Sequence, residues 1–150
     1  MARISKQRLT TLRTAAESAR RLHYAPATGV IVLAAAELEN GTVGGGANIE
    51  IVNLTLTKHA EEVAVLAAFA NDREPIARGR LSAVYVAGFE PCGSCRQFAA
   101  EFAAGGATWI LENVTQAELR GSSLLSLPAD RQPRIVSFDR YLPSPFLLYD

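Results

Sequence analysis

The stretch LSAVYVAGFEPCGSCRQFAAEFAAGGATWIL, residues 81–111, decides the fold of this chain. Leu81–Ala87 is an apolar run of the length that a buried strand has. A second run of this kind, Ala107–Leu111, follows a stretch with helical spacing that the pair Gly105-Gly106 ends. Strand, helix and strand in this order are typical of α/β proteins, in which helices cover the faces of a sheet.

The region upstream predicts a hairpin. Val30–Glu37 and Thr42–Glu50 flank the turn signal Glu39-Asn40-Gly41, so we expect two antiparallel strands. The triplet Gly44-Gly45-Gly46 lies within the second of them. It lacks the Lys-Ser/Thr of a P-loop and the spacing G-x-G-x-x-G. The triplet therefore indicates a bulged or closely approached strand rather than a phosphate cradle.

Two helices are also predicted before residue 81. Residues 5–22 carry small and apolar side chains at helical spacing among basic residues, and Pro26 follows the end of this helix. His59–Asn71 has the clearest helical pattern of the sequence. Its apolar stripe consists of Val63, Leu66, Ala67 and Ala70.

The remaining sequence completes a layered fold. Ile135–Phe138 is predicted to be a last short strand, whereas residues 112–133 are polar, rich in turn-forming residues and show no clear element. A hairpin followed by alternating helices and strands predicts an α/β fold, a three-layer α/β/α sandwich with a central mixed sheet of about five strands. The length of 150 residues predicts a single domain over 1–150.

Composition excludes several classes of protein. With 49% hydrophobic residues the chain can bury a core without disulfides. Its 15 basic and 15 acidic residues give no net charge, which argues against nucleic-acid binding. The apolar runs are too short to span a bilayer, and no signal-type segment is recognised, so we expect no membrane partner and a cytoplasmic location.

Two short motifs carry the chemistry. His59 begins a helix as His59-Ala60-Glu61, and Pro91-Cys92-Gly93-Ser94-Cys95 begins another. One imidazole and two thiolates are good zinc ligands, and helix N-termini favour thiolates. The sequence shows no obvious fourth ligand, which predicts a catalytic Zn²⁺ site with a position left for water.

A glutamate at this offset strengthens that interpretation. A lone C-x-x-C is equally typical of a redox pair, and a lone histidine at a helix start is more often a cap. Glu61 lies two residues after a ligand and can handle protons without binding the metal. His-x-Glu followed by Pro-Cys-x-x-Cys is the signature of zinc nucleobase deaminases.

The sequence resembles the cytidine deaminase family, and the resemblance extends beyond the metal motif. Tyr24-Ala25-Pro26 is similar to the start of the first strand of that family, and Asn48-Ile49-Glu50 to its Asn-x-Glu element. Cys95-Arg96-Gln97 and a Leu-Pro-x-x-Phe ending at Phe146 also match. The resemblance implies hydrolytic removal of the 4-amino group of a cytosine nucleoside, which is a small-molecule substrate.

The family also implies roles for individual residues. His59, Cys92 and Cys95 would bind zinc, and Glu61 would transfer protons. Asn48 and Glu50 would contact the ribose hydroxyls, and Ala60 would contribute to the substrate site. For Asn48 and Glu50 the alternative is that they are surface residues of the hairpin.

One departure from the family bears on assembly. Val30 stands where the family usually has an aromatic residue near the base. The family forms tetramers or dimers in which an aromatic residue at the position of Phe146 reaches a neighbouring active site. We therefore expect a homo-oligomer, a tetramer rather than a dimer, with Phe146 completing the pocket. The alternative is a tail folded on its own chain.

Three other functions stay open from the sequence. One is deamination of a modified or antibiotic nucleoside, because the ending is similar to that of blasticidin-S deaminase. Another is a non-catalytic zinc- or nucleotide-binding module of the same fold, against which Glu61 argues. The third is polynucleotide editing, which the balanced charge disfavours.

Overall fold

The computed structural model describes residues 3–143 and residue 145. Its strands form one five-stranded sheet in the order β2-β1-β3-β4-β5. β3 and β4 are parallel and the other neighbours are antiparallel, so the sheet is mixed, as predicted. The elements are α1 (Lys6–Ser18), η1 (Ala19–Leu22), β1 (Leu33–Leu38), β2 (Val43–Ala47), η2 (Leu54–Leu56), α2 (Ala60–Asn71), β3 (Leu81–Ala87), α3 (Gly93–Phe102), β4 (Ala103–Glu112), α4 (Gln116–Gly121), η3 (Leu124–Ser126), β5 (Arg134–Ser137) and α5 (Phe138–Tyr141).

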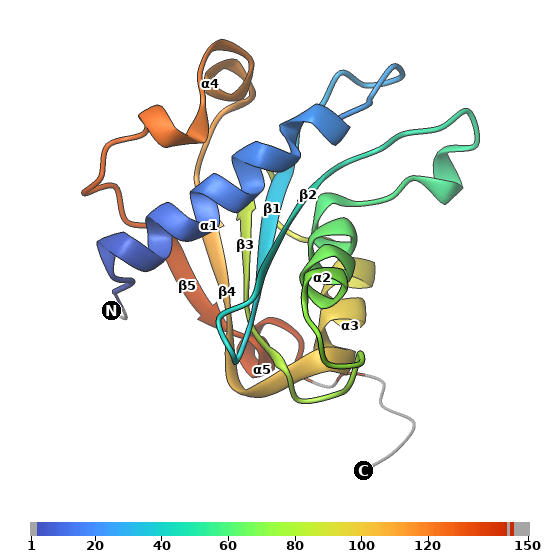
Figure 1. Cartoon of the computed structure of the whole chain (residues 1–150). Coiled ribbons are helices and arrows are strands. Elements are labelled where there is room, and N and C mark those ends of the chain that lie inside the picture. The colour runs from blue at the N-terminus through green and yellow to red at the C-terminus, as the bar shows by residue number, and fades with distance from the viewer. Residues whose placement is uncertain (1–2, 144, 146–150) are drawn as a thin grey trace.

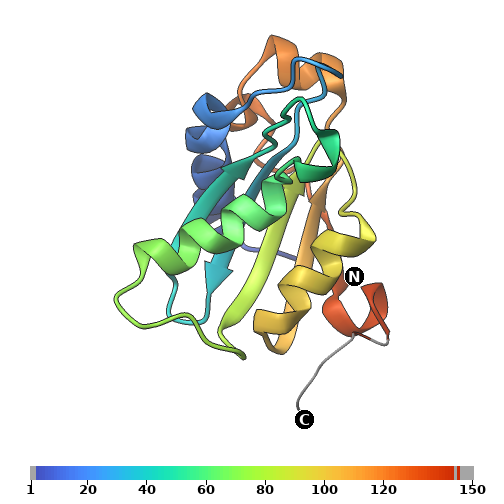
Figure 2. The same cartoon turned by 90° about the vertical axis from the view of Figure 1, so that its right-hand side faces the viewer.

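Helices cover both faces of the sheet. α1 lies on one face, and α2 and α3 lie side by side on the other (Figures 1 and 2). Each face has its own buried apolar cluster, one under α1 and one under α2 and α3. The predicted three-layer α/β/α sandwich is confirmed. No helix in residues 3–143 combines the length and the apolar character that crossing a membrane demands.

The predicted hairpin and first helix are confirmed. β1 pairs with β2 in antiparallel register, with Ala35 opposite Gly45. α1 and η1 together cover the range predicted for the first helix. The side chain of Ser5 caps α1 by accepting a hydrogen bond from the backbone N–H of Arg8 at 3.2 Å.

The apolar stripe predicted for α2 was wrong. The core-facing side contains Ala60, Ala64 and Ala68, whereas Leu66 is exposed. The physical reason lies in the opposing strand, because the glycines of β2 leave room only for small side chains. The large side chains of α2 that are buried are Val65 and Phe69, which the predicted stripe does not contain.

The glycine triplet is approached closely from both faces. A Cβ on Gly44 would lie 2.0 Å from the backbone nitrogen of Ala68, and one on Gly46 would lie 2.1 Å from the carbonyl oxygen of Ala60. A Cβ on Gly45 would meet the carbonyl oxygen of Ala15 on the opposite face. The prediction of a closely approached strand is confirmed.

Two details of the C-terminal half differ from expectation. The pair Gly105-Gly106 does not end α3, because the helix already ends at Phe102 and both glycines lie in β4. Gly106 has φ +82°, and the register between β3 and β4 shifts nearby. The glycines therefore shape an irregular start of the strand.

The segment 112–133 contains two short helices, α4 and η3, which the sequence did not reveal. Thr115 and Glu118 form a capping box at the start of α4. η3 packs against α1, and Glu17 of α1 accepts a hydrogen bond from the backbone N–H of Leu124 at 2.9 Å. This segment therefore closes the α1 face of the sheet.

Candidate functional site

The site begins where two helix N-termini meet. His59 is the residue before α2, and Cys92 is the residue before α3. The side chain of Glu62 reaches back to accept a hydrogen bond from the backbone N–H of His59 at 3.3 Å. Cys92 Sγ accepts one from the backbone N–H of Cys95 at 3.4 Å. Backbone capping therefore orients the side chains that precede and open these helices.

These side chains converge on one point. His59 Nδ1 lies 3.1 Å from Cys95 Sγ and 3.5 Å from Cys92 Sγ, and the two sulfurs are 3.3 Å apart. Ligands at about 2.0–2.3 Å from a tetrahedral zinc ion lie roughly 3.5 Å from one another. Both cysteines are free thiols. The geometry and the donor set fit zinc, so His59, Cys92 and Cys95 could hold this ion.

Burial makes a negative charge on the cysteines of this cluster unfavourable unless a cation lies beside them. Cys95 is buried, and this burial, together with the nearby Glu61 carboxylate, raises the pKa of its thiol. A thiolate there is stable only beside a cation. A zinc ion would supply that cation and release the thiol proton.

Glu61 lies beside the cluster and is itself buried, with 5% of its surface exposed. Burial raises the pKa of its carboxyl group above the usual value. No lysine or arginine forms an ion pair with Glu61 in the part of the chain that the structure describes. A buried carboxyl group without such a partner is typical of a group that binds a ligand or exchanges a proton.

A cavity of about 270 Å³ opens above Glu61. The predicted substrate residues Asn48, Glu50 and Ala60 all line it, together with His59, Glu61 and Cys92. Five further residues line the cavity without having been predicted as site residues: Val30, Val32, Thr57, Phe89 and Glu90. Phe89 and Glu90 directly precede Pro91-Cys92, so their place beside the metal motif was the available signal.

Asn48 is buried and braces the segment that precedes β1. Its Nδ2 donates to the carbonyl oxygen of Val30 at 2.8 Å, and its Oδ1 accepts from the backbone N–H of Val32 at 2.9 Å. His23 Nδ1 lies 3.1 Å from the same oxygen. One N–H of the Asn48 amide has no partner in these bonds and is available to the cavity.

Glu50 holds the same segment through different bonds. Its carboxylate accepts hydrogen bonds from the Thr28 hydroxyl at 2.5 Å and from the backbone N–H groups of Ala27 and Thr28. The Thr28 hydroxyl and then these amides hold the pKa of Glu50 below its usual value. Glu50 is therefore a carboxylate at neutral pH and is not a loose surface residue of the hairpin.

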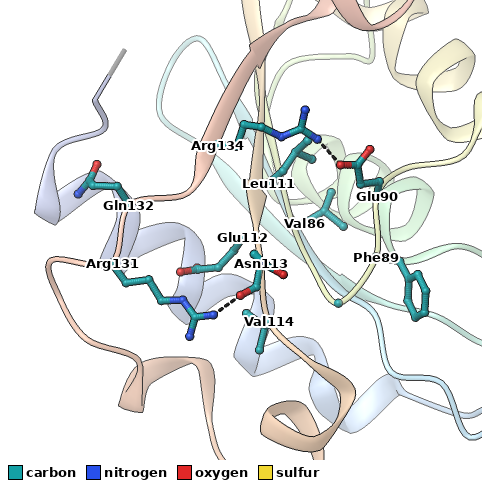
Figure 3. A pocket seen from close by; sticks show the side chains of 11 residues that line it. Val86, Phe89, Glu90, Leu111, Glu112, Asn113, Val114, Arg131, Gln132 and Arg134 are labelled. Atoms are coloured by element: carbon teal, nitrogen blue, oxygen red, sulfur yellow. Dashed lines mark hydrogen bonds and ion pairs between the residues drawn. The ribbon is translucent and has the colours of Figure 1, made fainter. Parts of the chain in front are cut away.

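A second cavity, of about 640 Å³, lies at the carboxyl ends of β3 and β4 (Figure 3). Arg131 and Arg134 line it, but Arg131 pairs with Glu118 and Arg134 with Glu90. Of the predicted site residues within the described part of the chain, none lines this cavity. Phe146 lies outside the described residues.

Comparisons with known proteins agree with this geometry. The family model of the cytidine and deoxycytidylate deaminase zinc-binding region matches residues 5–110. A cytidine deaminase of Halalkalibacterium halodurans is 36% identical over 83 residues, which are 55% of this chain and 63% of that protein. The match thus spans somewhat less than two thirds of that relative.

Solved structures extend the similarity to nearly the whole fold. The crystal structure of cytidine deaminase from Burkholderia pseudomallei has a TM-score of 0.69 and 28% identity, covering 91% of this chain and 97% of that one. Cytidine deaminase from Mycobacterium leprae has a TM-score of 0.64 and 25% identity, covering 89% and 96%. The sheet and the helices that carry the site are therefore shared with these proteins.

Proposed function

Because the chain belongs to the family of cytidine and deoxycytidylate deaminases with a zinc-binding region, we propose that it deaminates a cytosine nucleoside by hydrolysis. The products are the uracil nucleoside and ammonia. The observation that carries the proposal is the buried Glu61, which lies without a basic ion-pair partner beside the His59, Cys92 and Cys95 cluster at a ligand-sized cavity.

The residues divide the chemistry among them. His59, Cys92 and Cys95 would hold zinc, and a zinc ion there would supply the Lewis acid that makes a water molecule easier to deprotonate near neutral pH. A carboxylate oxygen of Glu61 accepts the proton that the water loses and gives it to the ring nitrogen next to the attacked carbon. Glu61 then takes the second proton, from the hydroxyl group now on the attacked carbon, and delivers it to the leaving amine, so one carboxyl group acts as base and as acid.

Asn48 and Glu50 select the sugar in this proposal. Asn48 offers its remaining amide N–H, and the Glu50 carboxylate has an acceptor position left after its three hydrogen bonds. A hydroxyl group of ribose can accept from one and donate to the other. The bonds of both residues to the segment before β1 fix their orientation, which lowers the entropy cost of binding.

We propose a homo-oligomer as the working form, a tetramer rather than a dimer, with Phe146 from one chain completing the pocket of another. Four exposed apolar side chains support an interface beside the site: Ile51, Val52, Leu54 and Leu56. They lie between Glu50 and Thr57, which both line the cavity. A second copy of the chain would bury these side chains.

Pyrimidine salvage in the cytoplasm is the proposed setting. Deamination of a free nucleoside is a salvage reaction, and two free thiols suit a reducing compartment.

A substrate panel tests the reaction. Zinc-loaded protein is incubated with cytidine, deoxycytidine, deoxycytidylate, cytosine and blasticidin S, and release of ammonia is followed. We expect turnover of the two nucleosides and little of cytosine, because cytosine lacks the sugar that Asn48 and Glu50 contact. No ammonia from either nucleoside would refute the proposal, and preference for blasticidin S would favour the antibiotic-directed alternative.

Sedimentation of the active protein tests the assembly. We expect a species of about four chains, and Phe146→Ala should raise KM because it removes a wall of the pocket. An active monomer, or unchanged kinetics of Phe146→Ala, would refute the role in a neighbouring site.

A further inference from the structure

The short segment between β3 and α3 is held rigidly. Gly88 has φ +113°, and a Cβ there would lie 2.6 Å from the carbonyl oxygen of Ile31. The turn at Gly88 therefore brings this segment against the chain that precedes β1. Val30 and Val32, the neighbours of Ile31, line the same cavity as Phe89.

The residues after Phe89 are anchored on the far side. Glu90 forms hydrogen bonds with Arg134 and with the hydroxyl group of Tyr141. Arg96 donates to the carbonyl oxygens of Pro91 at 2.9 Å and of Tyr141 at 3.1 Å. β5 and α5 thus fix the backbone on which Phe89 stands.

Glu90 and Phe89 point in opposite directions from this segment. Figure 3 shows Glu90 turned towards Arg134 and the ring of Phe89 directed away from that pair. The Phe89 side chain remains 57% exposed although its backbone is anchored. It takes part in none of the aromatic ring contacts among the described residues.

The cavity has little other flat apolar surface. Phe89 carries the one phenyl ring among the described residues that line it, and the other apolar side chains there are Val30, Val32 and Ala60. A pyrimidine ring has two flat faces that gain from contact with an aromatic ring. An anchored but uncovered phenyl ring provides such a surface without a cost for ordering its backbone.

We propose that Phe89 is the aromatic wall of the nucleoside site, against which the pyrimidine ring of the substrate packs. This inference rests on the proposed function and names a specificity-determining residue within it. It gives the chain an aromatic surface of its own, where Val30 provides none. Phe89 acts on binding, because it has no group that can transfer a proton.

A binding experiment tests the contact without turnover. The double variant Phe89→Trp, Glu61→Gln places a fluorescent indole at the wall and removes the proton carrier. We expect added cytidine to change the emission of this indole in a saturable way. The single variant Glu61→Gln measures the background of the fully buried Trp109. Leu125→Trp, Glu61→Gln is the matched control at an exposed position away from the cavity, and it should not respond.

The outcomes separate this inference from the proposed function. If the emission of Phe89→Trp, Glu61→Gln changes saturably with cytidine but the parent protein does not deaminate cytidine, the proposed contact of Phe89 stands and the proposed reaction is refuted. An active parent whose Phe89→Trp, Glu61→Gln variant shows no change with cytidine would refute the wall and retain the reaction.

Steady-state kinetics provide a second test. We expect Phe89→Ala to raise KM about tenfold, with kcat changed less than about twofold. Phe89→Tyr should restore the KM, whereas Leu125→Ala should have no effect. An unchanged KM in Phe89→Ala would overturn the assignment, and so would a loss of oligomers that accounts for the whole effect.

Discussion

Glu61 and Glu112 are both buried carboxyl groups, each with 5% of its surface exposed, but their surroundings differ. Glu112 ends β4 and accepts hydrogen bonds from Arg13 at 2.9 Å and from the Tyr85 hydroxyl at 2.5 Å. Glu61 has no such cation in the described part of the chain, and it lines the cavity that contains His59 and Cys92. Burial alone therefore does not distinguish a structural carboxylate from a chemical one.

The difference lies in how fully each group is satisfied. Arg13 also donates to the carbonyl oxygens of Leu127 and Arg131, so the pair with Glu112 ties α1 to the segment after η3. The charge of Glu112 is therefore balanced within the protein, by the buried guanidinium of Arg13. Glu61 retains that capacity at the cost of an unfavourable burial, which proteins tolerate mainly at functional sites.

The largest expected effect is on the reaction. Glu61→Gln should lower kcat by about 10²–10⁴-fold or more, because it removes the proton carrier, while zinc content and unfolding midpoint stay close to those of the parent. Steady-state assays, metal analysis and urea denaturation measure the three quantities. Glu62→Ala is the neighbouring control and should change kcat far less. If Glu61→Gln turned over substrate at the normal rate, Glu61 would not be the proton carrier and would not differ in function from Glu112.

Cys92→Ala should abolish most of the activity by a different route. It removes one of three ligands, so we expect zinc to fall well below the parent value of about one ion per chain. Metal analysis after dialysis measures this loss, and Ser94→Ala, at an exposed position between the cysteines, is the control. Full retention of zinc by Cys92→Ala would contradict the ligand set.

Glu112→Gln should show the reverse pattern, with loss of stability and little effect on chemistry. It leaves the buried Arg13 without its anion, which typically costs about 3–5 kcal/mol of unfolding free energy. Urea denaturation measures this loss, and kcat per folded molecule should stay within about threefold of the parent. A kcat loss as large as that of Glu61→Gln would show that both carboxylates serve the reaction.

A combined variant sharpens this test. Arg13→Met, Glu112→Leu, Tyr85→Phe removes the charges and the hydroxyl together, so no buried ion is left unpaired. We expect it to recover much of the stability that Glu112→Gln loses. If the combined variant were less stable than Glu112→Gln, the hydrogen bonds and packing of these side chains would stabilise the fold in addition to the pairing of their charges.

The smallest effect belongs to a carboxylate at the surface. The backbone N–H of Thr115, then Arg131 and the Thr115 hydroxyl, lower the pKa of Glu118 from 4.5 to about 2. Its contribution to stability is therefore full above pH 4.5 and is lost as the pH falls towards 2. The difference in urea midpoint between the parent and Glu118→Gln should shrink from pH 7 to pH 3. A difference that grows on acidification would contradict this linkage.

The features that could be predicted from the sequence are those that depend on residues close together in the chain. Two motifs, each within a few residues, predicted that His59, Cys92 and Cys95 would converge, and the structure brings them together. The strand-helix-strand pattern of residues 81–111 predicted the layers correctly. Both predictions depend on neighbours in the chain and on helix starts, which local sequence describes well.

Contacts between distant residues were not predictable in this way. Arg13 and Glu112 are 99 positions apart, and nothing in either neighbourhood indicates the other. The core-facing side of α2 was misassigned because it depends on the glycines of β2. The position of Phe89 beside Pro91-Cys92 is visible in the sequence, but the direction of its side chain depends on the turn at Gly88 and on the contact of Glu90 with β5.

The glycine triplet of β2 restricts how this protein can change over generations. At Gly46 every other amino acid would push against the backbone of Ala60, which stands between His59 and Glu61. A mutation on an edge strand therefore displaces two functional groups that it does not touch. We therefore expect no neutral substitutions at Gly46. A larger residue at Ala60 or Ala64 would be hindered by the same close contact between α2 and β2. We therefore expect the arrangement of His59 and Glu61 to persist only as long as β2 keeps these glycines.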